Sequence, residues 1–125
     1  MTTPSLEDIL QDIQNQLGSD FIATDVVGMD GLSIAGRAAN PNLDSTAAAA
    51  RFAMVMKLAS NVTEKIGMGD VEDSLVTTTD AYILTRFLGD GSYYWGITVT
   101  INATLGLVRM LMSEYANQIW EALPH

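Results

Sequence analysis

The chain has 125 residues, of which 48% are hydrophobic and 17% are charged, a balance that favours one globular domain over residues 1–125 and argues against disorder. Fifteen acidic residues against six basic ones give a net charge of −9, and because a phosphate-binding surface needs the opposite sign, we expect no nucleic-acid partner. The absence of cysteine excludes disulfides, thiolate nucleophiles and Cys-ligated zinc.

No segment of the sequence has the character of a membrane span or of a secretion signal. No stretch approaches about 18 uninterrupted apolar residues, and the amino terminus lacks the charged start and apolar run of a signal peptide. We therefore expect a cytoplasmic protein without membrane insertion.

The first third of the chain predicts a helix followed by a β-hairpin. Apolar residues recur at helical spacing over Leu6–Leu17, and Gly18 is a plausible end of the helix. β-Branched and aromatic residues then favour strands over Phe21–Val27 and Leu32–Ala38. The pair Asp30-Gly31 between them is a hairpin signal, since glycine accepts the positive φ that the turn requires.

A long helix is predicted in the middle of the chain, from Asp44 or Ser45 to about Ile66. One apolar stripe of this helix is assigned to the core, where it would pack against a sheet. It consists of Ala48, Phe52, Val55, Ala59, Val62 and Ile66. The front half is apolar on a second side, roughly 100° or more around the helix, formed by Ala47, Ala50, Met54 and Leu58. A helix with two apolar sides needs two partners, so we favour self-association over burial within one chain.

The second half of the chain predicts three strands, Asp73–Thr79, Ala81–Leu88 and Tyr93–Ile101, and a final helix over Leu105–Leu123. In the last strand alternate residues are expected to face opposite sides of the sheet. One side has Tyr93, Trp95, Ile97, Val99 and Ile101, and the other has Tyr94, Gly96, Thr98 and Thr100. The short connections indicate hairpins and hence an antiparallel sheet. The fold class is therefore α+β, a five-stranded antiparallel sheet with helices on both faces in the order α-β-β-α-β-β-β-α.

The side chains that catalysis or metal binding requires are scarce. His125 is the only histidine and the last residue, so we assign no catalytic residue. The densest acidic cluster, Asp70, Glu72 and Asp73, is interpreted as a solvated loop, and no metal is expected. Asp25 is unusual as an acid within a predicted strand, and we expect it to face solvent.

Two glycine-rich turns and four arginines also carry no assigned chemistry. Residues 67–70 and 89–92 lack the Lys and Ser/Thr that follow the glycines of a nucleotide-binding loop, so we expect no cofactor. No arginine is assigned as an arginine finger, because surface or dimer contacts would account for each of them as well as a catalytic role would. The four arginines are Arg37, Arg51, Arg86 and Arg109.

Three segments taken together point to a known family. They are Val26–Ala35 in the first hairpin, the alanine-rich start of the middle helix, and Asn102–Arg109 at the start of the last helix. In their order and separation they resemble the Roadblock dynein light chain family, which includes bacterial proteins that act on Ras-like GTPases. The resemblance spans nearly the whole chain and implies a single Roadblock-like domain of Roadblock/profilin-like fold.

The resemblance also implies a dimer, either a homodimer or a heterodimer with a paralogue. In that family two middle helices pack against each other and the third strand of each sheet can pair with its mate. The interface residues implied here are Ala47, Ala50, Arg51, Met54, Leu58, Ser74, Val76 and Thr78.

The function implied by the resemblance is a non-catalytic regulator or scaffold that binds a small Ras-like GTPase and modulates its nucleotide cycle. One alternative is a structural adaptor subunit without effect on GTP turnover. A further alternative is a small-molecule sensor with a pocket lined by Tyr82, Tyr93, Tyr94 and Trp95, which a fully packed interior would exclude.

Overall fold

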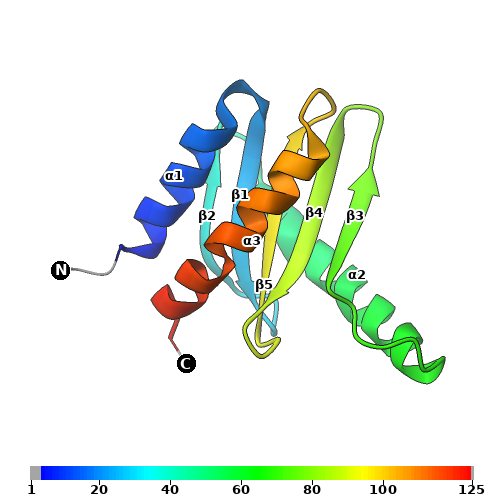
Figure 1. Cartoon of the computed structure of the whole chain (residues 1–125). Helices are drawn as coiled ribbons and strands as arrows, with labels where there is room; N and C mark the ends of the chain where they lie inside the picture. Colours follow the sequence, from blue (N-terminus) through cyan, green and yellow to red (C-terminus); the bar gives the residue numbers. More distant parts are fainter. Residues whose placement is uncertain (1–3, 125) are drawn as a thin grey trace.

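The computed structural model describes residues 4–124, and within them a five-stranded sheet lies between helices (Figure 1). The elements in chain order are α1 (Leu6–Leu17), a short 3-10 turn (Gly18–Asp20), β1 (Phe21–Gly28), β2 (Ser33–Ala38), α2 (Ser45–Lys65), β3 (Asp73–Thr77), β4 (Ala81–Leu88), β5 (Tyr93–Thr100) and α3 (Leu105–Ala122). The strands are antiparallel throughout and lie in the order β2-β1-β5-β4-β3. The predicted fold class and element order are confirmed.

The largest difference in an element's bounds is at the end of β3, which stops at Thr77 instead of the expected Thr79. The chain turns there because the Thr78 hydroxyl accepts hydrogen bonds from the backbone N–H groups of Asp80 and Ala81, at 3.1 and 2.9 Å. A threonine that satisfies turn amides in this way competes with continuation of the strand.

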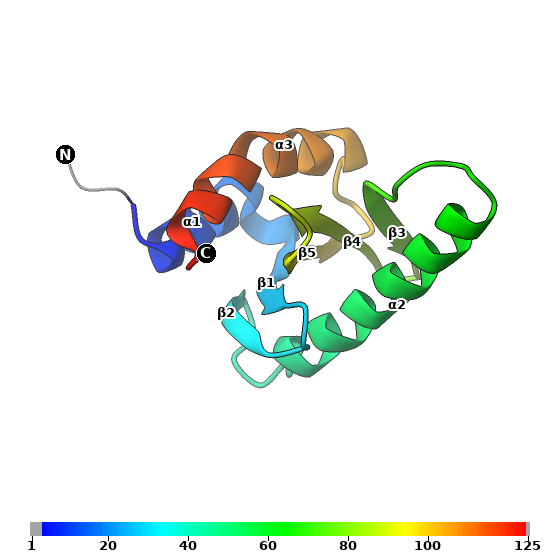
Figure 2. The same cartoon turned by 90° about the horizontal axis from the view of Figure 1, so that it is seen from below.

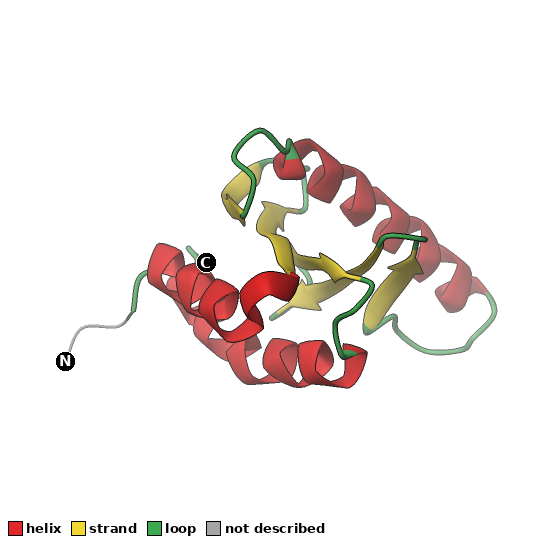
Figure 3. Cartoon of the chain, turned by 90° about the horizontal axis from the view of Figure 1, so that it is seen from above, coloured by secondary structure: helices red, strands yellow, loops and turns green. Residues whose placement is uncertain are grey.

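The two faces of the sheet are covered unequally. α1 and α3 lie side by side on one face, whereas α2 runs obliquely across the other (Figures 2 and 3). Among the helices of residues 4–124, none combines the length and the apolar character needed to cross a bilayer.

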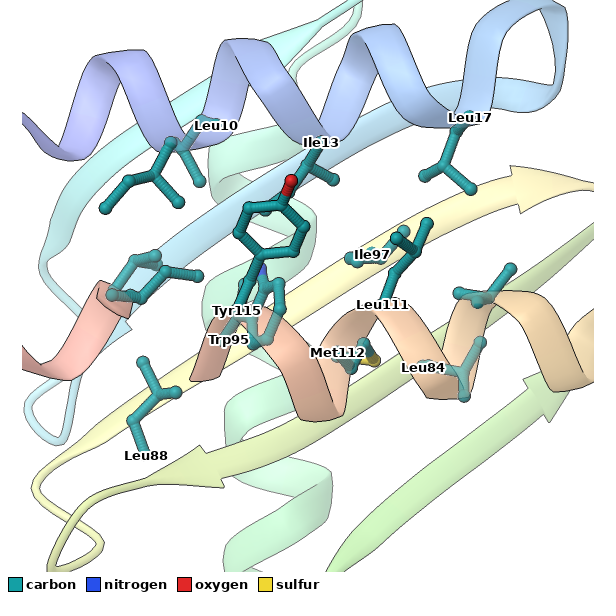
Figure 4. Packing of buried hydrophobic residues seen from close by; sticks show 14 of the residues in the cluster. Leu10, Ile13, Leu17, Leu84, Leu88, Trp95, Ile97, Leu111, Met112 and Tyr115 are labelled. Atoms are coloured by element: carbon teal, nitrogen blue, oxygen red, sulfur yellow. The ribbon is translucent and has the colours of Figure 1, made fainter. Parts of the chain in front are cut away.

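The main core lies between the sheet and the α1–α3 pair (Figure 4). Side chains from both helices and from β4 and β5 meet there, among them Leu10, Ile13, Leu84, Ile97, Leu111 and Met112. The indole N–H of the buried Trp95 donates to the Thr24 hydroxyl at 2.9 Å, and that hydroxyl donates to the Gly96 carbonyl at 2.9 Å. The Trp95 indole and the Thr24 hydroxyl are thereby paired, which removes most of the cost of burying these two groups.

Strand β5 confirms the alternation predicted from the sequence. Tyr93, Trp95, Ile97 and Val99 belong to or pack against the α1–α3 core. Tyr94, Gly96 and Thr98 face α2 on the other side of the sheet.

The core face assigned to α2 was only partly right, since Phe52 and Ala59 of that stripe are half-buried but its other large residues are not. Val55, Val62 and Ile66 are exposed, and the side chains buried against the sheet are Ala53 and Met56. The observed face is displaced by one residue along the sequence, which rotates it by roughly 100° around the helix. In addition, the carboxyl end of α2 extends past the β3 edge of the sheet, where nothing in the described chain covers it (Figures 1 and 2).

The α1–α3 core predicts a stability difference between buried and exposed positions. Ile13→Ala removes a fully buried side chain and should lower the free energy of unfolding by about 2–5 kcal/mol through lost burial and a new cavity. Met110→Ala, on the exposed side of α3, should change it by less than about 0.5 kcal/mol. Urea titrations followed by circular dichroism measure both, and similar losses in the two variants would contradict this core assignment.

Candidate functional site

The outward side of α2 carries a run of exposed apolar side chains, which we call the α2 stripe. Its members are between 46% and 67% exposed and are Met54, Val55, Leu58, Val62 and Ile66. Spacings of three and four residues place them on one side of the helix. Single exposed apolar side chains are ordinary on protein surfaces, but a continuous stripe of this kind marks an interaction surface.

The structure places the α2 residues of the expected interface on or beside the α2 stripe. Ala47, Arg51, Met54 and Leu58 are exposed, and Ala50 is half-buried. The second apolar side inferred from the sequence is therefore not covered by the described part of the chain. The α2 stripe also includes the exposed residues that were predicted to lie in the core, Val55, Val62 and Ile66.

The β3 residues of the expected interface lie at an edge of the sheet. β3 pairs only with β4 among residues 4–124, so its outer edge is unpaired in the described chain. Ser74 and Val76 are half-buried and stand opposite Thr85 and Ile83, two residues that face α2. Thr78 is exposed in the turn after the strand.

A cavity of about 280 Å³ lies between the amino-terminal half of α2 and the sheet. Most of its walls are apolar and many are small, because alanines on α2 face alanine and glycine on the strands. The residues around it are Ile22, Ala23, Asp25, Val27, Leu43, Ser45, Ala48, Ala49, Phe52, Ala81, Ile83, Thr85, Tyr94, Gly96 and Thr98. Sequence patterning gave no sign of this hollow, since alanines in a helix ordinarily indicate close packing.

Asp25 is buried at the edge of this cavity, which corrects the expectation that it faces solvent. Only 4% of the residue is exposed, because β1 is an inner strand and α2 begins above it. The Ser45 hydroxyl donates a hydrogen bond to Asp25 Oδ1 at 3.2 Å. Burial raises the pKa of Asp25 to about 6; the Ser45 hydrogen bond opposes this shift and the nearby Asp44 charge adds to it.

Tyr94 is the one aromatic residue of the proposed sensor pocket that lines the cavity. Its hydroxyl is buried, accepts and donates no hydrogen bond within the described chain, and has a pKa raised by burial. Tyr82, Tyr93 and Trp95 lie with the α1–α3 core on the other face of the sheet. Three of the four residues predicted to line a sensor pocket therefore lie away from this cavity, and only Tyr94 lines it.

The other residues singled out in the sequence lie in different surroundings. Arg109 forms an exposed ion pair with Asp73 at 3.7 Å, and the Arg37 side chain donates a hydrogen bond to Gln14 of α1. Between residues 4 and 124, no group of three or more histidine and acidic side chains is placed to hold a metal ion. His125 lies outside the described residues.

Comparison with solved structures identifies the architecture. MglB from Myxococcus xanthus is similar with a TM-score of 0.81 at 14% identity, covering 93% of this chain and 92% of that one. A Roadblock/LC7 domain from Streptomyces avermitilis gives 0.80 at 15% identity, with 93% and 95% covered. The gliding protein MglB from Thermus thermophilus gives 0.81 at 12% identity, with 94% and 87% covered. No protein-family model matches the sequence, and no curated protein matches it either.

The buried Asp25 carboxyl predicts an unusual pH dependence of stability. Because its pKa rises from 3.8 to about 6 on folding, the folded chain holds the proton more tightly, and stability should fall as pH rises between these values. Asp25→Asn cannot ionise and should therefore be more stable than the wild type by about 3 kcal/mol at pH 7.5, with a small difference near pH 4.

Urea unfolding at the two pH values, at one protein concentration, measures this effect. The exposed Asp80→Asn is the matched control and should change the unfolding free energy little at either pH. Parallel pH profiles for wild type and Asp25→Asn would show that Asp25 is not buried as described.

Proposed function

Because the chain has the Roadblock fold, we propose that it is a non-catalytic dimeric regulator or scaffold that binds a small Ras-like GTPase. The observation that carries this proposal is the α2 stripe, an apolar surface that the described chain leaves uncovered. The Roadblock family, which the sequence resembles, includes bacterial proteins that act on such GTPases. Fold and exposed helix together support this role better than a catalytic one.

The dimer would form mainly through α2. Two copies of the α2 stripe related by a two-fold axis would cover each other, since a symmetric interface brings the same patch of both subunits together. The small side chain of Ala47 allows close approach at one end of the stripe, while Arg51 supplies a polar rim. A paralogue with the same stripe would satisfy the same surface, which gives the heterodimeric form of the proposal.

The edge of β3 would extend the contact. Its outer N–H and C=O groups, which pair with no strand in residues 4–124, are suited to pair with the equivalent strand of a second copy. Ser74, Val76 and Thr78 are the residues of this edge in the proposed interface.

The charge of the chain indicates which kind of surface a GTPase partner would present. A net charge of −9 favours a basic face on the partner and speeds the encounter at low ionic strength. We assign no arginine finger, so an effect on GTP hydrolysis would come from rearrangement of the GTPase's own residues. A cytoplasmic location is part of the proposal.

The dimer proposal predicts that charge in the α2 stripe gives a monomer. Met54→Asp combined with Leu58→Asp would bury two unpaired carboxylates in the contact, which costs more than the contact gains. Light scattering should show the mass of one chain for this variant and of two chains for the wild type.

The matched control places the same charges on α3. Leu107→Asp combined with Met110→Asp changes two exposed apolar side chains on the opposite side of the molecule and should leave the dimer intact. An unchanged mass in the α2 variant would remove that helix from the interface.

The partner proposal predicts nucleotide-dependent capture of a GTPase. The tagged chain, incubated with extract of its own cells containing either GDP or a non-hydrolysable GTP analogue, should enrich a small GTPase in one nucleotide state. Failure to enrich any GTPase with either nucleotide would refute the proposal. Hydrolysis by the captured GTPase with and without the chain then separates a regulator, which changes the rate, from an adaptor, which does not.

A further inference from the structure

We propose that the cavity between α2 and the sheet binds a small apolar molecule that carries one protonated amine, with its ammonium group paired to the Asp25 carboxylate. This inference goes beyond the proposed function and requires neither a GTPase nor a dimer. It rests on the shape of the cavity, on the uncompensated negative group within it, and on a second buried polar group at its wall.

The hollow follows from the uneven size of the side chains beneath α2. Ala53 and Met56 of α2 pack with the ring of Tyr94, and this contact sets the distance between helix and sheet. Closer to the start of the helix, Ala48 and Ala49 are too short to fill that distance. Apolar cavities of about 150 Å³ stay dry and accept benzene, so about 280 Å³ has room for an aromatic ring with a short chain.

The glycines on either side of Asp25 shape the site further. Asp25 stands opposite Gly36 of β2 and Gly96 of β5. A Cβ atom on Gly36 would lie 2.3 Å from Asp25 Oδ1, so the carboxylate occupies the space that a side chain would take there. A Cβ atom on Gly96 would meet nothing closer than the Leu84 carbonyl oxygen at 3.5 Å, which leaves the other side of the carboxylate open.

The charge of Asp25 has no counter-charge among the described residues around it. No Lys, Arg or His is among the described residues that line the cavity. From α2 the nearby charged group is Asp44, which is also negative, and from β2 the Arg37 side chain pairs with Gln14 on the far face of the sheet. The facing groups of β4 and β5 are uncharged. The Tyr94 hydroxyl is the titratable group among them, and burial raises its pKa, so it is neutral.

A buried carboxylate in this situation favours a ligand that supplies the missing cation. An ammonium group would restore the charge balance and donate hydrogen bonds to the carboxylate, whereas an anionic or purely apolar ligand would leave it uncompensated. The Tyr94 hydroxyl, which has no partner in the described chain, is a second group able to accept an N–H. The acidic character of the whole chain acts in the same direction by attracting cations.

The test uses 2-phenylethylamine as the probe and 2-phenylethanol as a neutral control of the same shape. The full chain is titrated with each at pH 7.5 and followed by two-dimensional amide NMR. The amine should give saturable shifts centred on Asp25, Ala48 and Gly96, with a dissociation constant of about 1 mM or below. The alcohol should bind at least about tenfold more weakly, because it brings no charge to the carboxylate.

Two variants separate the charge from the shape of the site. Asp25→Asn keeps the side-chain shape and should weaken amine binding about tenfold or more while leaving alcohol binding nearly unchanged. Ala49→Leu keeps a good helix former on α2 and should weaken both ligands by filling the cavity. Unchanged circular dichroism spectra confirm that each variant is folded.

The pH dependence supplies a further readout. Lowering the pH from 7.5 to 5 protonates Asp25, so wild-type affinity for the amine should fall, while that of Asp25→Asn should not. Equal binding of amine and alcohol, full amine affinity in Asp25→Asn, shifts that map away from the cavity, or no shifts up to about 10 mM amine would each overturn the proposal.

Discussion

A single helix laid obliquely across one face of a five-stranded sheet leaves surface that no described residue of the chain covers. On the other face two adjacent helices complete a continuous core. The α2 face has one helix whose carboxyl end extends past β3 and whose alanine-rich start does not fill the space beneath it. The exposed α2 stripe and the cavity are therefore two results of the same arrangement, one outside the helix and the other inside.

Much of this arrangement could be predicted from the sequence where the local pattern was unambiguous. Strand β5 alternates large apolar and small or polar residues, and its two faces are where the pattern placed them. In α2, by contrast, alanine and methionine occur all around the helix, so several faces look equally apolar and the buried one was misassigned by one residue. The burial of Asp25 depended on which strands flank β1 and where α2 begins, neither of which is encoded near residue 25.

The fold and the functional site rest on different grounds. At 12–15% identity the similarity to solved Roadblock structures concerns architecture, and architecture alone does not assign function. The functional argument comes from features that conflict with an optimal fold, namely an exposed apolar helix face and a buried carboxyl whose ionisation destabilises the folded state. Such local conflicts concentrate at functional positions, because residues there are retained for something other than stability.

The uneven cores have a dynamic consequence for the monomer. The side chains that anchor α2 form a small cluster around Ala53, Met56 and Tyr94, far less extensive than the core under α1 and α3. Regions with few buried contacts open in sub-global steps at lower free energy than the whole domain. Backbone amide hydrogens of α2 should thus exchange with deuterated solvent well before those of β1 and β5. The exchange would pass through a form in which α2 has detached while the sheet, α1 and α3 stay folded.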